Sequence, residues 1–123
     1  AAVADAIAEI GVPADLAERF WNVTRENITT LKDLAGWWVL YRDGAEPLID
    51  DEDAEFVAQA LALLPDGPYT AETWGHWTKQ VKDATGRKGK GLFMPLRKAL
   101  TGQERGPDMR DVMPLLQTVR AKS

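Results

Sequence analysis

Six basic residues and five glycines stand close together between Gly86 and Pro107, in the stretch GRKGKGLFMPLRKALTGQERGP. Glycines let backbone N–H groups approach an anion closely, while arginine and lysine supply positive charge, so this mixture suits a phosphate backbone. The run TGQERGP (101–107) predicts a non-helical elbow after a helix, and exposed peptide groups in such an elbow can read an unstacked base. The residues alone therefore favour nucleic acid, and structured RNA in particular, with a helical protein–protein adaptor domain as the alternative.

The positive charge of this stretch contrasts with an acidic chain. The formal net charge is −4, and residues 1–78 carry 4 basic against 15 acidic side chains, whereas residues 79–105 carry 8 basic against 2 acidic ones. A basic segment inside an acidic chain is typical of an electrostatic binding surface. A solvated helix face would give the same asymmetry, and charge alone does not separate the two interpretations.

Catalytic and metal-binding chemistry find little support in the residues. The chain has no cysteine and a single histidine, His76, and the loop at 86–91 lacks the spacing and the Lys-Ser/Thr ending of a phosphate-binding loop. The acidic cluster IDDEDAE (49–55) resembles a calcium loop, but it lacks the central glycine and the closing glutamate, so we interpret its acids as partners of a helix dipole. We expect no catalytic residue and no metal site in this chain.

The spacing of apolar residues predicts an all-α protein, a bundle of about seven helices in two small subdomains. No run alternates as a half-buried strand would. The segments with helical spacing are residues 3–10, 13–26, 31–41, 51–64, 70–81, 92–100 and 109–116. The loop that contains Gly44 and Pro47 divides a first subdomain, 1–45, from a second, 46–123, and we expect a hinge near residues 43–50.

Local signals predict how single helices begin and which side chains they bury. Thr30 is expected to cap the third helix. Pro95 is expected in the first turn of the sixth helix, where its missing N–H has no intrahelical partner to lose. The apolar residues expected on that helix are Leu92, Phe93, Leu96 and Leu100. Trp74 and Trp77 share one face of the fifth helix, so we interpret them as core residues rather than as platforms for stacking bases.

The run GKGLFMPLRKALTGQERGPDMRDVMPLL closely resembles the C-terminal end of the bacterial glutamyl-tRNA synthetases, a family of class I aminoacyl-tRNA synthetases. Its most specific part is PLRKALTG, which is followed by a Gly-Pro elbow and a last helix. The segments NITTLKDLAGW and TAETW also resemble the family, so the resemblance covers essentially the whole chain. It implies two helical subdomains that bind the anticodon arm of tRNA(Glu), in a monomer with no DNA or membrane partner.

The same resemblance implies that the catalytic part of the enzyme is missing from this sequence. The family's ATP-binding motifs do not occur in these 123 residues, so we expect the chain to bind RNA and to catalyse nothing by itself. ATP and Mg²⁺ would belong to the catalytic domain of a parent glutamate–tRNA ligase, and no cofactor is expected here. The chain starts without methionine or a leader-like segment, so we expect a piece of a longer, cytoplasmic protein.

The resemblance also implies which residues contact RNA. Arg97 corresponds to the arginine of the family's P-L-R motif, expected near the anticodon bases and on the same surface as Lys90 and Gly106. Gly106, Pro107 and Met109 match elbow positions that contact the middle and last bases. Two local alternatives stay open, because Arg97 also fits a helix face opposite an acid and Pro107 is also a common first residue of a helix. RNA contacts are further expected from Lys88, Lys90 and Arg105.

One position departs from the family pattern. Many members carry an arginine three residues before the threonine of the TLK run, and this chain has Asn27 there. In the family that arginine helps to separate glutamate anticodons, which end in C, from glutamine anticodons, which end in G. Arginine offers only donors, whereas asparagine offers a donor and an acceptor, so we predict that the protein also accepts tRNA(Gln). Two alternatives are that Arg25 takes over this role, or that Asn27 merely ends the second helix.

Overall fold

The computed structural model describes residues 2–122, and these fold into seven α-helices linked by 3₁₀ turns and loops, without a strand. The prediction of an all-α protein with about seven helices is confirmed. The helices are α1 (Ala2–Glu9), α2 (Ala14–Thr24), α3 (Asp33–Asp43), α4 (Ala54–Leu63), α5 (Thr73–Thr85), α6 (Lys90–Thr101) and α7 (Met109–Val112). None of these helices is long and apolar enough to cross a membrane.

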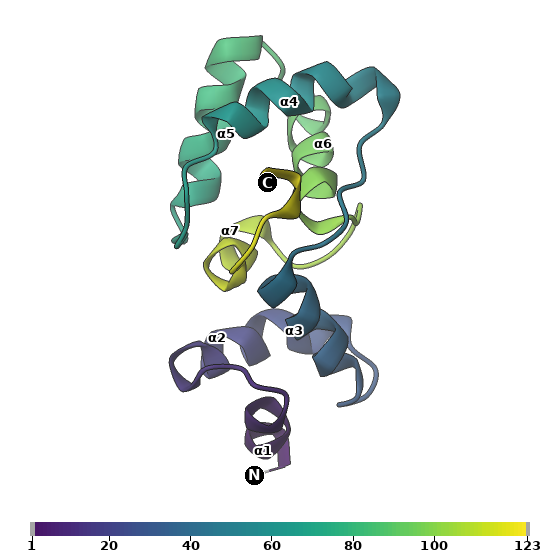
Figure 1. The fold of residues 1–123 in the computed structure, drawn as a ribbon, viewed down its shortest axis with the longest axis vertical. Helices are drawn as coiled ribbons and strands as arrows, with labels where there is room; N and C mark the ends of the chain where they lie inside the picture. The colour runs from purple at the N-terminus through teal and green to yellow at the C-terminus, as the bar shows by residue number, and fades with distance from the viewer. Residues whose placement is uncertain (1, 123) are drawn as a thin grey trace.

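The helices form an elongated molecule (Figure 1), with α1, α2 and α3 at one end, α4, α5 and α6 at the other, and α7 between them. A single hydrophobic core runs through the molecule from Ile7 to Val119. Near the middle, α7 and the 3₁₀ turn Met113–Leu115 pack against α2. The predicted boundary after residue 45 falls in the non-helical segment that follows α3, and the division into two subdomains remains a prediction.

The segment after α3 is held against the second half of the chain. Gly44 ends α3 with φ +83°, and a Cβ atom there would lie 3.1 Å from the Thr118 carbonyl oxygen. A Cβ atom on Gly102, where φ is +70°, would lie 2.6 Å from the carbonyl oxygen of Glu46. The predicted helix break is thus present, and the close backbone approach at two glycines explains how the segment is anchored. Motion about this segment, the predicted hinge, remains a prediction.

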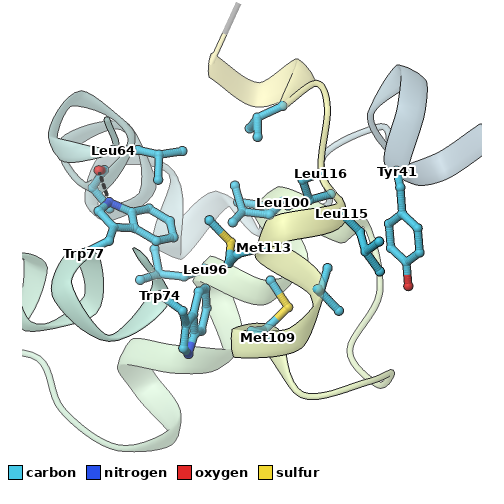
Figure 2. Packing of buried hydrophobic residues seen from close by; sticks show 14 of the residues in the cluster. Tyr41, Leu64, Trp74, Trp77, Leu96, Leu100, Met109, Met113, Leu115 and Leu116 are labelled. Atoms are coloured by element: carbon cyan, nitrogen blue, oxygen red, sulfur yellow. Dashed lines mark hydrogen bonds between the residues drawn. The ribbon is translucent and has the colours of Figure 1, made fainter. Parts of the chain in front are cut away.

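Two tryptophans of α5 lie in the core, as the sequence predicted. Trp77 is fully buried, and its indole Nε1 donates a hydrogen bond of 2.8 Å to the carbonyl oxygen of Ala60 (Figure 2). Trp74 packs edge-on against Trp77, with ring centroids 5.7 Å apart, and only 9% of its surface is exposed. The indole hydrogen bond lets Trp77 be buried without leaving a donor unsatisfied.

Helix α3 begins differently from the prediction. It starts at Asp33, and Thr30 does not cap it with its side chain. The Asp33 carboxylate instead accepts hydrogen bonds from the backbone N–H of Thr29, at 2.8 Å, and of Thr30, at 3.2 Å. These two bonds lower the pKa of Asp33 from its ordinary value. A negative charge in the first turn also complements the helix dipole.

The start of α6 is the clearest disagreement with the sequence prediction. The helix begins at Lys90, so Pro95 lies inside it and not in its first turn. Proline has no N–H, and the carbonyl oxygen of Gly91 therefore lacks its usual intrahelical donor. Arg87 Nη1 donates to that oxygen at 3.2 Å and also to Asp53 at 2.8 Å. A side chain from outside the helix thus replaces the hydrogen bond that Pro95 removes.

Candidate nucleic-acid interface

The basic segment contains two charges that serve the fold. Arg87 pairs with Asp53 at 2.8 Å, and its guanidinium lies 4.0 Å from the centre of the Phe56 ring. The Lys98 side chain is 9% exposed and pairs with Asp50 at 2.7 Å, a hydrogen bond that raises the pKa of Lys98. Both acids belong to the cluster at 49–55. Part of the positive charge noted in the sequence is therefore neutralised inside the molecule.

The remaining cations of the segment keep their side chains free. Within residues 2–122, no side-chain hydrogen bond or salt bridge is made by Lys88, Lys90, Arg97 or Arg105. Lys88, Lys90 and Arg105 are exposed, whereas Arg97 is half-buried. Free cations on a surface are available to an anionic partner such as a phosphate backbone.

Arg97 combines partial burial with the lack of a hydrogen-bonding partner. Burial lowers the pKa of Arg97, while the charge of the Asp108 carboxylate acts in the opposite direction. An arginine side chain nevertheless stays protonated in proteins and presents five N–H donors. No nitrogen of the Arg97 guanidinium is both fully buried and unpaired, so its donors stay accessible from solvent. The arrangement therefore favours an acceptor that comes from another molecule.

Three adjoining pockets run along the elbow at residues 101–107. The Asn27 pocket lies between the end of α2, α3 and the elbow, and its walls include Asn27, Lys32, Trp37 and Gln103. The Pro107 pocket includes Trp37, Tyr41, Arg97, Gln103, Arg105, Gly106 and Pro107. The Phe93 pocket includes Trp74, Lys90, Phe93, Arg97, Gly106, Asp108 and Met109. Each pocket shares two or more of its residues with the next, so the three form one continuous strip.

Gly106 is the point of the strip where residues from separate elements converge. A Cβ atom on Gly106 would lie 3.4 Å from Arg97 Nη1, 3.8 Å from Gln103 Oε1 and 3.9 Å from Trp37 Cη2. These three atoms come from α6, the elbow and α3. A glycine therefore leaves the surface open between the Pro107 and Phe93 pockets, and any longer side chain would fill part of it.

A buried hydroxyl also lines the Pro107 pocket. Tyr41 is fully buried, and its hydroxyl makes no hydrogen bond to the residues that the structure describes. Burial raises the pKa of Tyr41 to about 12, although Thr24 and Arg97 lie close enough to oppose this shift. Tyr41 is therefore protonated at neutral pH, and its O–H group can donate a hydrogen bond.

The structure brings together most of the residues that the sequence predicted to contact RNA. Arg97, Lys90 and Gly106 line one pocket, as expected. The neighbouring pockets contain Arg105, Pro107 and Asn27. Whether these residues bind RNA remains a prediction.

Three predicted contacts lie differently from the rest. Arg25 and Lys88 are exposed but line none of the three pockets. Met109 is 2% exposed, and its side chain packs in the core near Leu96 and Met113 (Figure 2). Its side chain therefore supports the floor of the Phe93 pocket and presents little surface to a base.

Sequence reasoning missed two prominent residues of the strip. Gln103 and Trp37 each line two pockets, and neither was expected at the site. A signal for Trp37 existed in the Trp37–Trp38 pair, because adjacent side chains of a helix point in directions about 100° apart, so two neighbouring tryptophans do not face the same way. Trp38 is buried, and Trp37 lies where the Asn27 pocket meets the Pro107 pocket.

Comparison with known proteins identifies the family. Residues 11–121 match the model of the anticodon binding domain family, and the chain belongs to that family. A glutamate–tRNA ligase 1 of Cereibacter sphaeroides is 69% identical over 121 residues, which cover 98% of this chain and 27% of the relative. A glutamate–tRNA ligase 2 of Ruegeria sp. is 71% identical over 113 residues, 92% of this chain and 26% of the relative.

A further relative, glutamate–tRNA ligase 1 of Roseobacter denitrificans, is 69% identical over 120 residues, with 98% of this chain and 27% of the relative covered. The chain thus spans about a quarter of the length of the curated relatives that it matches. No solved structure matches it significantly.

Proposed function

We propose that this chain binds the anticodon arm of a tRNA and forms the anticodon-binding part of a glutamate–tRNA ligase. The supporting observation is Arg97, a half-buried guanidinium without a hydrogen-bonding partner at the junction of two pockets. Base edges and phosphate oxygens offer the acceptors that its donors lack. Membership of the anticodon binding domain family supports the same conclusion.

The strip has the form that an unstacked RNA loop requires. Sequence-specific RNA recognition targets bases that are splayed out of the helix. The Asn27 pocket, about 410 Å³, and the Phe93 pocket, about 330 Å³, each have room for such a base, whereas the Pro107 pocket between them, about 10 Å³, does not. The free cations Lys90 and Arg105 line the strip, and the exposed Lys88 stands two residues before Lys90 in the sequence. These charges suit the phosphates between the bases. Arg97 lines the Phe93 pocket, so it would contact the base held there.

The activity of the whole protein is proposed from its relatives. The relatives named above are glutamate–tRNA ligases about four times the length of this chain. On that basis we propose that the parent protein attaches glutamate to tRNA with ATP. We further propose, from the family resemblance of the sequence, that it acts in the cytoplasm and as a monomer. ATP and Mg²⁺ would bind to its catalytic domain, while this chain would contribute recognition of the anticodon.

We also propose that the Asn27 pocket accepts anticodons of both tRNA(Glu) and tRNA(Gln). The Asn27 amide makes no hydrogen bond within the described part of the chain, residues 2–122, so it can turn either its oxygen or its nitrogen toward a base. Gln103 lines the same pocket and adds a second amide. The two amides present both donors and acceptors to a base, whereas an arginine presents only donors.

A binding titration tests the proposed function. The anticodon stem-loop of tRNA(Glu) is titrated with the chain at several salt concentrations, and a stem-loop with a scrambled loop serves as the reference. We expect preference for the tRNA(Glu) loop and an affinity that falls as salt rises, because phosphate contacts release counterions. A helical protein–protein adaptor would show neither effect.

Two arginine variants test whether RNA binds at the strip of pockets. Arg97→Ala should weaken binding, whereas Arg42→Ala should not. Arg42 is an exposed arginine that pairs with Asp43 and lines none of the three pockets. Equal losses in both variants would indicate that the chain responds only to total charge, which would contradict the proposed site.

A further inference from the structure

Phe93 is a large aromatic side chain whose exposure the fold does not explain. It is one of the apolar residues expected on the sixth helix, and 44% of its surface is exposed. Its ring lies beside Trp74, with ring centroids 6.3 Å apart and an angle of 35° between the planes. Part of the ring is therefore backed by a buried tryptophan, and the rest is open to solvent.

The position of Phe93 distinguishes it from the other exposed apolar residues. Among residues 2–122, five further large apolar side chains are exposed, at positions 31, 39, 48, 49 and 63. None of these five lines a pocket of the strip, whereas Phe93 does. Phe93 is thus exposed on the same surface as the unpaired cations Lys90 and Arg97.

On one face of α6, Phe93 lies between two basic residues. Lys90, Phe93 and Arg97 are separated by three and four residues, which places them on one face of the helix, and all three line the Phe93 pocket. The helical rise sets Lys90 about 4.5 Å before Phe93 and Arg97 about 6 Å after it along the axis. Proteins that hold single-stranded nucleic acid combine aromatic platforms with flanking cations in this way.

We propose that Phe93, supported by Trp74, stacks an unpaired nucleobase of the bound RNA loop between the cations of Lys90 and Arg97. This inference rests on the proposed function and adds the side chain that holds a base in the Phe93 pocket. The pocket has a volume of about 330 Å³, the lower end of the ~300–1,000 Å³ range for small-ligand sites, which suits one base better than a larger group. The positive charge on both sides favours RNA over an apolar protein segment.

Conservative variants of Phe93 separate stacking from simple apolar contact. Phe93→Leu keeps an apolar side chain of good helix propensity but removes the aromatic face, whereas Phe93→Tyr keeps that face. Leu63→Ala removes an exposed apolar residue from α4, outside the strip, and serves as the control. Circular dichroism and thermal melting establish that each variant is folded, which we expect because these side chains are exposed.

The probe is the anticodon stem-loop of tRNA(Glu) with 2-aminopurine placed at one anticodon position at a time. Stacking on an aromatic ring quenches the fluorescence of 2-aminopurine. With the unaltered chain, we expect additional quenching on binding at one position. Phe93→Leu should abolish that quenching and weaken binding by about 5- to 140-fold, the range that corresponds to loss of one base–aromatic stack. Phe93→Tyr and Leu63→Ala should bind as the unaltered chain does.

The salt dependence supplies an independent readout. Phe93→Leu removes no charge, so the slope of log affinity against log salt should stay the same, whereas Lys90→Ala should reduce its magnitude by about one. If Phe93→Leu binds as tightly as the unaltered chain with quenching intact, the stacking role is overturned and the proposed function stands. If the unaltered chain does not bind the stem-loop even at low salt, both are overturned.

Discussion

Replacing Arg97 by methionine is expected to weaken RNA binding and to stabilise the folded chain at the same time. The guanidinium is half-buried, and within residues 2–122 it has no hydrogen bond or salt bridge. Its burial lowers the pKa of Arg97, and the Asp108 charge opposes this shift only in part. Methionine keeps the apolar length of the side chain without the charge, so the packing of the stem is largely retained.

The size of both effects follows from the surroundings of Arg97. Shielded polar groups without a partner destabilise a protein by about 1–3 kcal/mol. Arg97 remains partly in solvent, and the Asp108 charge favours its protonated form, so we expect about 0.5–1 kcal/mol of stabilisation, or roughly 2–4 °C in Tm. Loss of a bidentate contact to a base would weaken RNA binding by about 1–3 kcal/mol, roughly 5- to 140-fold.

Two measurements on the same variant check this prediction. Urea unfolding followed by tryptophan fluorescence gives the free energy of unfolding, and anisotropy of a labelled stem-loop gives the affinity. Arg42→Met is the control, because Arg42 and Asp43 form an exposed pair with about half of each side chain in solvent, 50% and 54%. We expect little change in either quantity for that variant.

The reasoning about Arg97 can fail in two ways. A destabilisation of Arg97→Met by more than about 1 kcal/mol would mean that the guanidinium supports the fold and is not held unpaired for a ligand. Unchanged affinity for the stem-loop in a folded variant would remove Arg97 from the binding site.

Three further outcomes are expected. Lys88→Ala should weaken binding of all RNA loops alike and reduce the salt slope by about one, because an exposed lysine contacts phosphate and not bases; a loss confined to one loop sequence would contradict this. Asn27→Arg should create a preference for anticodons ending in C over those ending in G, whereas a preference above about a hundredfold in the unaltered chain would refute relaxed recognition. Gly102→Ala should lower the free energy of unfolding, measured by urea titration, more than Gly86→Ala does. Both glycines end a helix at positive φ, but only at position 102 would the added Cβ atom lie 2.6 Å from the Glu46 carbonyl oxygen. Equal losses would show that the close approach to Glu46 relaxes freely.

The helices could be predicted from the sequence because their apolar spacing is regular, but the details of α6 could not. The rule that places proline in a first turn considers only the helix itself. Here Arg87, from the preceding loop, supplies the missing hydrogen bond to Gly91, and the helix begins five residues before Pro95. Phe93 is adjacent to the fully buried Leu92, and spacing alone does not show which residue at the edge of a helical face reaches solvent.

The site residues that match the family's motifs could be predicted from the sequence. The residues that reach the site only because distant segments fold together could not. Arg97 and Gly106 were expected together and share a pocket. Gln103 was missed because its place beside Asn27 depends on how the elbow folds back onto α3, which no local pattern encodes. The charge count also overstated the binding surface, since Lys98 pairs with an acid 48 residues away in the sequence.

The two hydrogen bonds of Arg87 connect Gly91, four residues later in the sequence, with Asp53, 34 residues earlier. A chain with an ordinary residue at position 95 would regain the N–H that bonds Gly91, and Arg87 would then keep only its pairing with Asp53. Loss of Arg87 beside an unchanged Pro95 would instead leave a carbonyl oxygen without its donor. We therefore expect positions 53, 87 and 95 to change together during evolution, with the arginine retained wherever the proline is.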